Sequence, residues 1–456
     1  MGSNPTSTAN ASARQGGARE SWGKRRFVLE PQSTALFLSL MIVFGALVVG
    51  VVFASHPAVR LLVACLAFLP AMLFGVAAVN KYYGYYETWG AVVADFTGGG
   101  VLNVPYVPAL GPRTAQRFGH LLGDAINTHQ AALTGAEIGL RVTGVASRIS
   151  RKVIIYLPPQ YFQRQYARYR FPALELIHGQ PGEPQDWMAA LDVPATLQTL
   201  IAEHLARPAV LVMPDVNGGR ALSLQCLNEV GGAADDTYVA RDVPTFVAAR
   251  LRVLRPGRSW GIAGYSEGGY CAANLALRHP SRYGFAGVMS GYFRPMANRV
   301  EAGHAIKRED PFRHDASLRR QNSPIDILRH LPAGSHIPAF WIGAAHASRA
   351  DVANATAFVA LLRARDPATP LTITSDGAHN AVAWRGMIPP MLKWMTLRRP
   401  PGGAKAACPG SRPVSCSQPQ PSRGQAHGRA PQPVGAAPPR ALGAGRLPDK
   451  VLHANE

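Results

Sequence analysis

The sequence predicts an α/β fold: a mainly parallel sheet with helices on both faces, preceded by a hairpin of two transmembrane helices. Three observations predict it. Short apolar strands alternate with helical segments through residues 138–397, which is typical of a parallel sheet with crossover helices. Residues 260–270 indicate a strand, a tight glycine turn and a helix. Two apolar runs near the N-terminus are each long enough to cross a bilayer.

The chain begins with a polar tail, residues 1–33, which is rich in small residues and arginine and is expected to be disordered. The apolar runs follow in residues 34–80, separated by a short turn. A signal peptide would have a shorter apolar region, and core helices would show a polar face. We therefore expect a cell-membrane protein with two spans. Five basic residues in the tail favour a cytoplasmic side for both ends of the hairpin, but the side stays open.

Residues 81–137 are punctuated by glycine and proline, and we expect them to connect the hairpin to the next domain. A helix-like piece covers residues 114–128. The connector begins with an aromatic group that consists of Tyr82, Tyr83, Tyr85, Tyr86 and Trp89. Because Tyr and Trp favour the membrane interface, these rings are expected at headgroup level or, alternatively, packed against the domain.

Strands and helices are expected to alternate within the domain, residues 138–397. Besides the strand that begins at Trp260, apolar runs predict strands over residues 142–147, 152–157, 173–177, 209–213, 285–289, 339–342 and 371–374. Helical spacing predicts helices over residues 193–206, 243–253, 271–277, 352–365 and 388–395. Residues 398–456 are rich in Pro, Gly, Ala and Arg and are expected to be disordered.

The glycine turn Gly264-Tyr265-Ser266-Glu267-Gly268 has the spacing G-x-S-x-G. A serine at the tip of so sharp a turn adopts a strained conformation, and its neighbours two positions away must be small, or the strand and helix collide. This pattern is the nucleophile elbow of the α/β-hydrolases and predicts Ser266 as a nucleophile. The alternative is an ordinary glycine-rich loop, because the chain holds 45 glycines.

A serine nucleophile needs a base and an acid that orients the base, and in this fold the acid and then the histidine follow the serine. His379 lies after the last expected strand, where the base belongs. Of three carboxylates shortly before it, Asp366 and Asp376 have turn positions, whereas Asp351 opens a helix after the penultimate strand. We predict Asp351 as the acid, with a helix N-cap as its alternative role.

The oxyanion of the reaction needs two hydrogen-bond donors. One is expected to be the backbone N–H of Glu267, directly after the nucleophile. The second is expected from the loop His178-Gly179-Gln180 after an early strand, where Gly179 permits close approach and Gln180 supplies the N–H. The alternative role of this loop is a plain turn.

The composition and charge of the chain indicate which classes of partner and cofactor to expect. The net charge is +20, but residues 1–33 and 401–456 contribute +3 and +5 of it, and the rest is scattered. Without a basic stripe or a nucleic-acid motif, we expect no nucleic-acid partner and some attraction to anionic lipid surfaces. The histidines lack ligand spacing, so no metal or cofactor is expected. Cys226 and Cys271 could pair in an oxidising compartment, a point that the sequence leaves open.

The chain resembles the esterase branch of the α/β-hydrolases, which includes esterase D-type enzymes and the actinobacterial mycolyltransferases. The resemblance covers residues 140–397. Its motifs are Tyr156-Leu157-Pro158-Pro159, His178-Gly179-x-Pro181-Gly182, Met213-Pro214-Asp215, Tyr238 through Asp242-Val243-Pro244, the elbow itself, Ser290-Gly291, Asn322-Ser323-Pro324 and Gly377-x-His379-Asn380. It implies Ser266 as nucleophile, His379 as base, Asp351 as acid, and Gln180 and Glu267 as oxyanion donors. One departure is a longer segment, residues 343–350, between the penultimate strand and Asp351.

Three functions follow as hypotheses. The first is a membrane-anchored serine esterase that forms an acyl-enzyme on Ser266 and resolves it with water. The second is an acyltransferase that gives the acyl group to a sugar or lipid hydroxyl, as the mycolyltransferases do. The third is a non-catalytic module of the same fold that binds an envelope or membrane partner. The expected substrate is an ester, for which the predicted anchor suggests a lipid or envelope component, and the oligomeric state is open.

Overall fold

The computed structural model of the protein describes residues 29–97, 102–103 and 126–397. Both tails expected to be disordered, residues 1–33 and 398–456, lie outside the described residues, except for the last five residues of the first. The same holds for most of the helix-like piece, residues 114–128.

Two long apolar helices form a hairpin, α1 (Thr34–Phe53) and α2 (Pro57–Tyr83), followed by α3 (Trp89–Thr97). The Ser33 side chain caps α1 by accepting from the Leu36 N–H, and Pro57 opens α2, where its missing N–H costs nothing. Gly84 ends α2 in the left-handed conformation with φ +69°. Both helices are long and apolar enough to cross a membrane.

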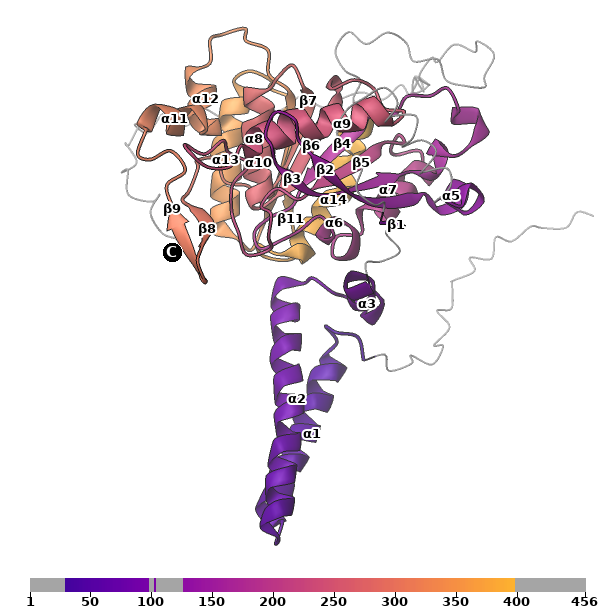
Figure 1. Ribbon diagram of the computed structural model, residues 1–456, viewed down its shortest axis with the longest axis vertical. Coiled ribbons are helices and arrows are strands. Elements are labelled where there is room, and N and C mark those ends of the chain that lie inside the picture. The colour runs from indigo at the N-terminus through magenta and orange to yellow at the C-terminus, as the bar shows by residue number, and fades with distance from the viewer. Residues whose placement is uncertain (1–28, 98–101, 104–125, 398–456) are drawn as a thin grey trace, which may run out of the picture. The chain divides into compact units, whose positions relative to one another are not determined.

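The domain is built on one sheet of nine strands, in the order β1-β2-β3-β5-β4-β6-β7-β10-β11 (Figure 1). Only the β2–β3 and β3–β5 pairs are antiparallel, and the others are parallel. The strands are β1 (Leu102–Asn103), β2 (Ala136–Thr143), β3 (Ser150–Leu157), β4 (Ala173–Ile177), β5 (Val210–Pro214), β6 (Gly257–Tyr265), β7 (Tyr283–Met289), β10 (Ala339–Ala345) and β11 (Leu371–Thr374). A separate hairpin joins β8 (Asn298–Ala302) and β9 (Ala305–Glu309).

Helices cover both faces of this sheet, as predicted. The longer ones are α7 (Val193–Ala202), α9 (Val243–Arg250), α10 (Glu267–Arg278), α13 (Arg349–Arg363) and α14 (Ala381–Leu397). The shorter ones are α5 (Thr128–Thr134), α6 (Asp186–Ala189), α8 (Asp235–Thr237), α11 (Ala316–Gln321), α12 (Pro324–His330), η1 (Pro159–Tyr161), η2 (Arg164–Tyr166) and η3 (Tyr238–Asp242).

Alternation along the central strands divides the core between the two faces. On β4, Ala173 and Ile177 belong to the cluster beneath α9, α10 and α13, whereas Leu174 and Leu176 belong to the cluster beneath α6, α7 and α14. Side chains of successive strand residues point to opposite faces, so a strand covered on both sides is mainly apolar, and in β4 the exception is the buried Glu175. Because these strands are parallel, their carboxyl ends lie at the same edge of the sheet, and the expected site residues follow them there.

Several element boundaries differ from the prediction. The first strand of the domain is β2, residues 136–143 rather than 142–147, because the buried alternation starts at Ala136 and Gly144 begins the turn. The final helix starts at Ala381 rather than residue 388 and contains Pro389 and Pro390. The connector also contributes β1, whose two residues pair with β2 at the sheet edge.

Candidate active site

Ser266 lies at the turn between β6 and α10, with φ 54° and ψ −119°. This is a strained conformation for a residue with a side chain. A Cβ on Gly264 would lie 2.1 Å from the Gly268 carbonyl oxygen, and a Cβ on Gly268 would lie 2.0 Å from the Ile177 carbonyl oxygen. The two glycines are therefore required by close backbone packing around the turn, as the sequence pattern predicts.

A chain of two hydrogen bonds joins Ser266, His379 and Asp351. The Ser266 Oγ and His379 Nε2 are 2.8 Å apart, and His379 Nδ1 and Asp351 Oδ1 are 2.9 Å apart. Asp351 is buried, whereas the His379 side chain is 43% exposed. This arrangement fits an Nδ1–H that donates to the carboxylate and an Nε2 that accepts the serine O–H. Such a relay can move a proton from Ser266 to an imidazole held in one tautomer.

The three carboxylates considered for the acid have different contacts. Ser348, not Asp351, caps α13, because its side chain accepts from the Asp351 N–H. The Asp366 carboxylate accepts from the Ala368 N–H within a turn, and Asp376 Oδ2 accepts from the Ser375 hydroxyl. Of the three carboxylates considered, Asp351 is the one that the structure brings to His379.

The two predicted oxyanion donors belong to segments next to Ser266. Glu267 is the first residue of α10, where backbone N–H groups have no acceptor within the helix. A Cβ on Gly179 would lie 3.2 Å from the Ser266 Cβ, so the loop that carries Gln180 passes directly over the nucleophile. The Gln180 side chain donates to the Ala221 carbonyl at 3.2 Å. A developing negative charge there would meet the positive end of α10.

A buried carboxylate next to the nucleophile was not foreseen from the sequence. Glu267 Oε2 accepts from the Ser223 hydroxyl, and Oε1 accepts from the Gln225 N–H at 3.4 Å. Burial raises the pKa of Glu267, against the hydrogen bonds from Ser223 and Asn217. The neighbouring Cys226 forms a disulfide with Cys271 on α10. The hydrogen bonds of Glu267 and the disulfide thus both attach the loop of residues 223–226 to α10.

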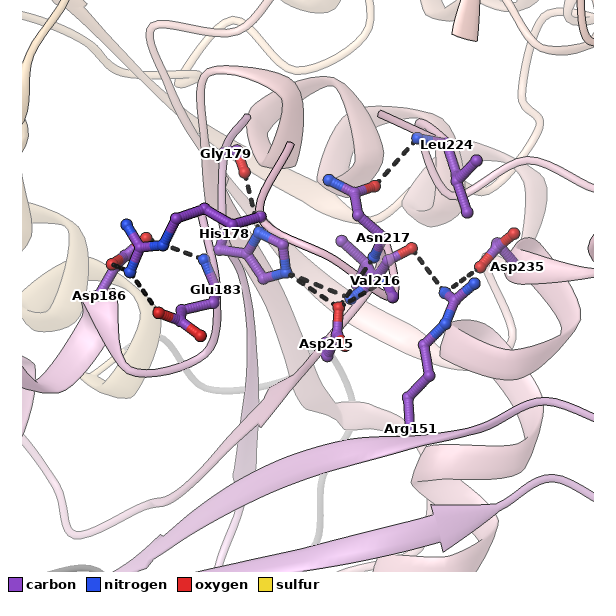
Figure 2. A network of polar contacts seen from close by, with 12 residues as sticks. Arg151, His178, Gly179, Glu183, Asp186, Asp215, Val216, Asn217, Leu224 and Asp235 are labelled. Atoms are coloured by element: carbon purple, nitrogen blue, oxygen red, sulfur yellow. Dashed lines mark hydrogen bonds and ion pairs between the residues drawn. The ribbon is translucent and has the colours of Figure 1, made fainter. Parts of the chain in front are cut away.

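The loop His178-Gly179-Gln180, which we call the oxyanion loop after its predicted role, rests on a second buried polar network (Figure 2). The His178 ring lies between the Gly179 carbonyl, 2.8 Å from Nδ1, and the Val216 N–H, 3.2 Å from Nε2. Asp215 lies 3.8 Å from Nε2 and accepts instead from the N–H groups of Asn217 and Gly218. The sequence does not predict that His178 supports this loop, because His178 and Asp215 follow different strands and are brought together only in the folded domain.

Aromatic and polar neighbours complete the surroundings of His379. The Trp384 ring meets the His379 ring edge to face at a centroid distance of 5.5 Å, and it also packs against Tyr265. The Tyr265 hydroxyl donates to the buried Asp186. Among the described residues, no group of three or more His, Cys, Asp or Glu side chains could hold a metal ion.

Known proteins resemble part of this chain. An uncharacterized protein of Corynebacterium glutamicum is 25% identical over 253 residues, covering 55% of this chain and 58% of that one. The MPT51/MPB51 antigen of Mycobacterium tuberculosis is 30% identical over 132 residues, covering 24% of this chain and 44% of the antigen. The chain therefore spans about half the length of these relatives.

A ferulic acid esterase of known structure is 17% identical, with a TM-score of 0.48, and covers 58% of this chain and 98% of its own. The family described as "Putative esterase" matches residues 147–395, which is more than half of the chain and contains Ser266, Asp351 and His379. This confirms the resemblance and the α/β-hydrolase fold drawn from the sequence motifs, and the chain belongs to this esterase family.

Proposed function

We propose that this chain is a membrane-anchored serine esterase that works through an acyl-enzyme on Ser266. The observation that carries the proposal is the hydrogen-bonded chain Ser266–His379–Asp351 at a strained elbow. A histidine with a purely structural role does not need a hydrogen bond to the hydroxyl of the half-buried serine at such a turn. The family match supports the esterase class, and the geometry supports the proposed residue roles.

In the proposed reaction, His379 Nε2 takes the Ser266 hydroxyl proton while Oγ bonds to the ester carbonyl carbon. The carbonyl oxygen becomes an oxyanion that accepts from the backbone N–H groups of Gln180 and Glu267. The bond to the alcohol oxygen then breaks, and His379 returns the proton to the leaving alcohol. Water repeats the sequence on the acyl-enzyme and releases the carboxylic acid, while Asp351 stabilises the imidazolium in both halves.

The anchor is proposed for α1 and α2. No residue of α1 is buried, and most of the apolar side chains of α2 are exposed. So much exposed apolar surface requires a covering, and a bilayer supplies one. A signal sequence is the alternative for α1. The pairing of α1 with α2, for example the edge-to-face contact of Phe37 and Phe74 at 5.2 Å, favours a hairpin that stays in the membrane.

Two observations disagree about the side of the membrane. The charge rule favours a cytoplasmic domain. The Cys226–Cys271 disulfide favours an oxidising compartment, because cytosolic proteins rarely keep such bonds. We propose the oxidising side, since both sulfurs are buried in the domain core and form part of its fold.

The side can be measured with Val145→Cys, a 62% exposed position on the domain, in a chain whose Cys65, Cys408 and Cys416 are changed to serine. An impermeant maleimide applied to intact cells should label it. Labelling only after lysis would place the domain in the cytoplasm.

The activity is tested with the purified full chain and p-nitrophenyl esters, with Ser266→Ala as the blank. We expect release of p-nitrophenol with wild-type protein only. Adding a sugar or a long-chain alcohol then separates water from a hydroxyl acceptor, since acyl transfer would yield a new ester. A folded protein inactive on all of these esters would favour the binding module.

A further inference from the structure

The short segment that follows α2, residues 82–87, lies against the loop that carries His379. The Asn380 side chain, one residue after the base, donates to the Tyr82 carbonyl at 2.9 Å. The Arg385 guanidinium donates to the Gly84 carbonyl at 2.8 Å and pairs with Glu87 at 2.7 Å. We call residues 82–87 the juxtamembrane segment. It is thus bonded to both the base loop and the first turns of α14.

The same segment also reaches the oxyanion loop. The Tyr85 hydroxyl donates to the Pro181 carbonyl at 3.2 Å, one residue after Gln180. The Tyr85 ring packs on the core cluster beneath α14, and burial raises the pKa of Tyr85 to about 12, so the hydroxyl remains a donor. The juxtamembrane segment therefore contacts the neighbours of two site residues, His379 and Gln180.

The juxtamembrane segment packs closely against α14. Gly84 has φ +69°, and a Cβ there would lie 2.6 Å from the Val382 Cγ2 of α14. Arg385 is only 19% exposed and also donates to the Ala190 carbonyl at 2.6 Å. Its guanidinium thus joins α14, the juxtamembrane segment and the end of α6, which is an arrangement for fixed placement.

The charges of α2 show how close this contact is to the bilayer surface. Arg60 and Lys81 are 21 residues apart on the helix, or about 32 Å at the rise of an α-helix. A hydrocarbon core is about 30 Å thick, so the two charges match its two surfaces. Tyr82 follows Lys81 directly and is 74% exposed, and Tyr83 is 41% exposed. Both rings suit the headgroup region.

We propose that the juxtamembrane segment holds the Ser266 site at the membrane surface, so that the enzyme takes esters lying in the bilayer interface in preference to soluble esters. This inference rests on the proposed function and on the proposed anchor. The substrate class is an amphiphilic ester whose carbonyl lies at headgroup level. Its acyl chain would stay in the lipid or against the exposed Tyr82 and Tyr83 rings, and the bond changes are those of the proposed reaction.

The test uses the full chain reconstituted in phosphatidylcholine vesicles, with the protein counted by fluorophosphonate titration. Two esters are compared, p-nitrophenyl acetate in solution and p-nitrophenyl palmitate in the bilayer. The measured quantity is the ratio of kcat/KM for the palmitate to that for the acetate. Arg385→Gln should lower this ratio about tenfold, the size expected for losing a hydrogen bond to a charged group. Arg385→Lys should restore part of it.

The matched control is Arg278→Gln, which removes a half-buried arginine that pairs with Asp236 at the far end of α10. Its ratio should equal that of the wild type. An unchanged ratio in Arg385→Gln would overturn the proposal. If the two kcat/KM values fell equally, the segment would only support the base loop. If Arg385→Gln does not fold, Tyr85→Phe removes the Pro181 contact alone and is held to the same criterion. Failure of the proposed function is distinct, since wild-type protein would then take no fluorophosphonate.

Discussion

The histidine–aspartate pairs His379–Asp351 and His178–Asp215 lie in the same domain, and their surroundings differ. His379 meets Asp351 at 2.9 Å and turns its second nitrogen to Ser266. His178 lies 3.8 Å from Asp215, is fully buried, and has a backbone group at each ring nitrogen (Figure 2). The first pair can take up a proton at Nε2, whereas the second has both nitrogens occupied.

The comparison shows that proximity to a carboxylate does not make a histidine a base. A third pair, His279 and Asp236 at 2.8 Å, makes the same point, because Asp236 also pairs with Arg278 there. What distinguishes His379 is an exposed ring edge and a serine held by a strained turn. The buried pair instead fixes the loop that carries Gln180.

The largest expected effect separates the two pairs directly. Ser266→Ala or His379→Ala should lower kcat by about 10⁶-fold, as when a triad nucleophile or base is removed. The reason is that either change removes one side of the Ser266–His379 hydrogen bond through which the proton moves. Ester hydrolysis at saturating substrate measures it, with thermal unfolding as the control for folding. Residual activity near that of the wild type would exclude this serine–histidine pair.

The next effect tests the acid. Asp351→Asn should lower kcat by about 10³–10⁴-fold, because an amide neither stabilises the imidazolium nor holds its tautomer. Asp376→Asn is the matched control, since that carboxylate contacts Ser375 on an exposed turn. Equal losses in the two variants would remove Asp351 from the triad.

A pH effect on stability comes from another buried group, Glu175 on β4. Burial raises its pKa to about 8, and the Tyr283 hydroxyl lies 2.8 Å from Oε2. The folded state then holds a proton that the unfolded state releases, so the free energy of unfolding should fall as pH rises from about 4.5 to about 8. The fall is on the order of 5 kcal/mol.

Glu175→Gln should flatten that dependence. Chemical denaturation of the full chain in detergent at pH 5 and pH 8.5 measures the difference. A slope equal to that of the wild type would show that Glu175 is ionised in the folded state.

The smallest effect concerns the buried pair. His178→Ala should lower the free energy of unfolding by about 1–3 kcal/mol, because it leaves the Val216 N–H without its acceptor. Thermal unfolding measures it, and His279→Ala serves as the more exposed control. Hydrolysis should fall far less than in His379→Ala. A loss as large as that of His379→Ala would contradict the division of roles.

Much of the site follows from local pattern. The spacing around Ser266 reflects backbone collisions that glycine alone avoids, and His379 follows the last strand as the fold requires. The contacts of Glu267 with Ser223 and of His178 with Val216 could not be predicted, because they join distant loops with no shared spacing. The early start of α14 was hidden by Pro389 and Pro390, which usually mark a helix boundary. The two residues of β1 were too few to form a pattern.

The most direct test of the central assignment is fluorophosphonate labelling of the purified chain, with mass spectrometry to locate the adduct. Wild type and His178→Ala should both carry the adduct on Ser266, and His379→Ala and Ser266→Ala should carry none there. An adduct on another serine, or an adduct on Ser266 that persists without His379, would contradict the Ser266–His379–Asp351 triad.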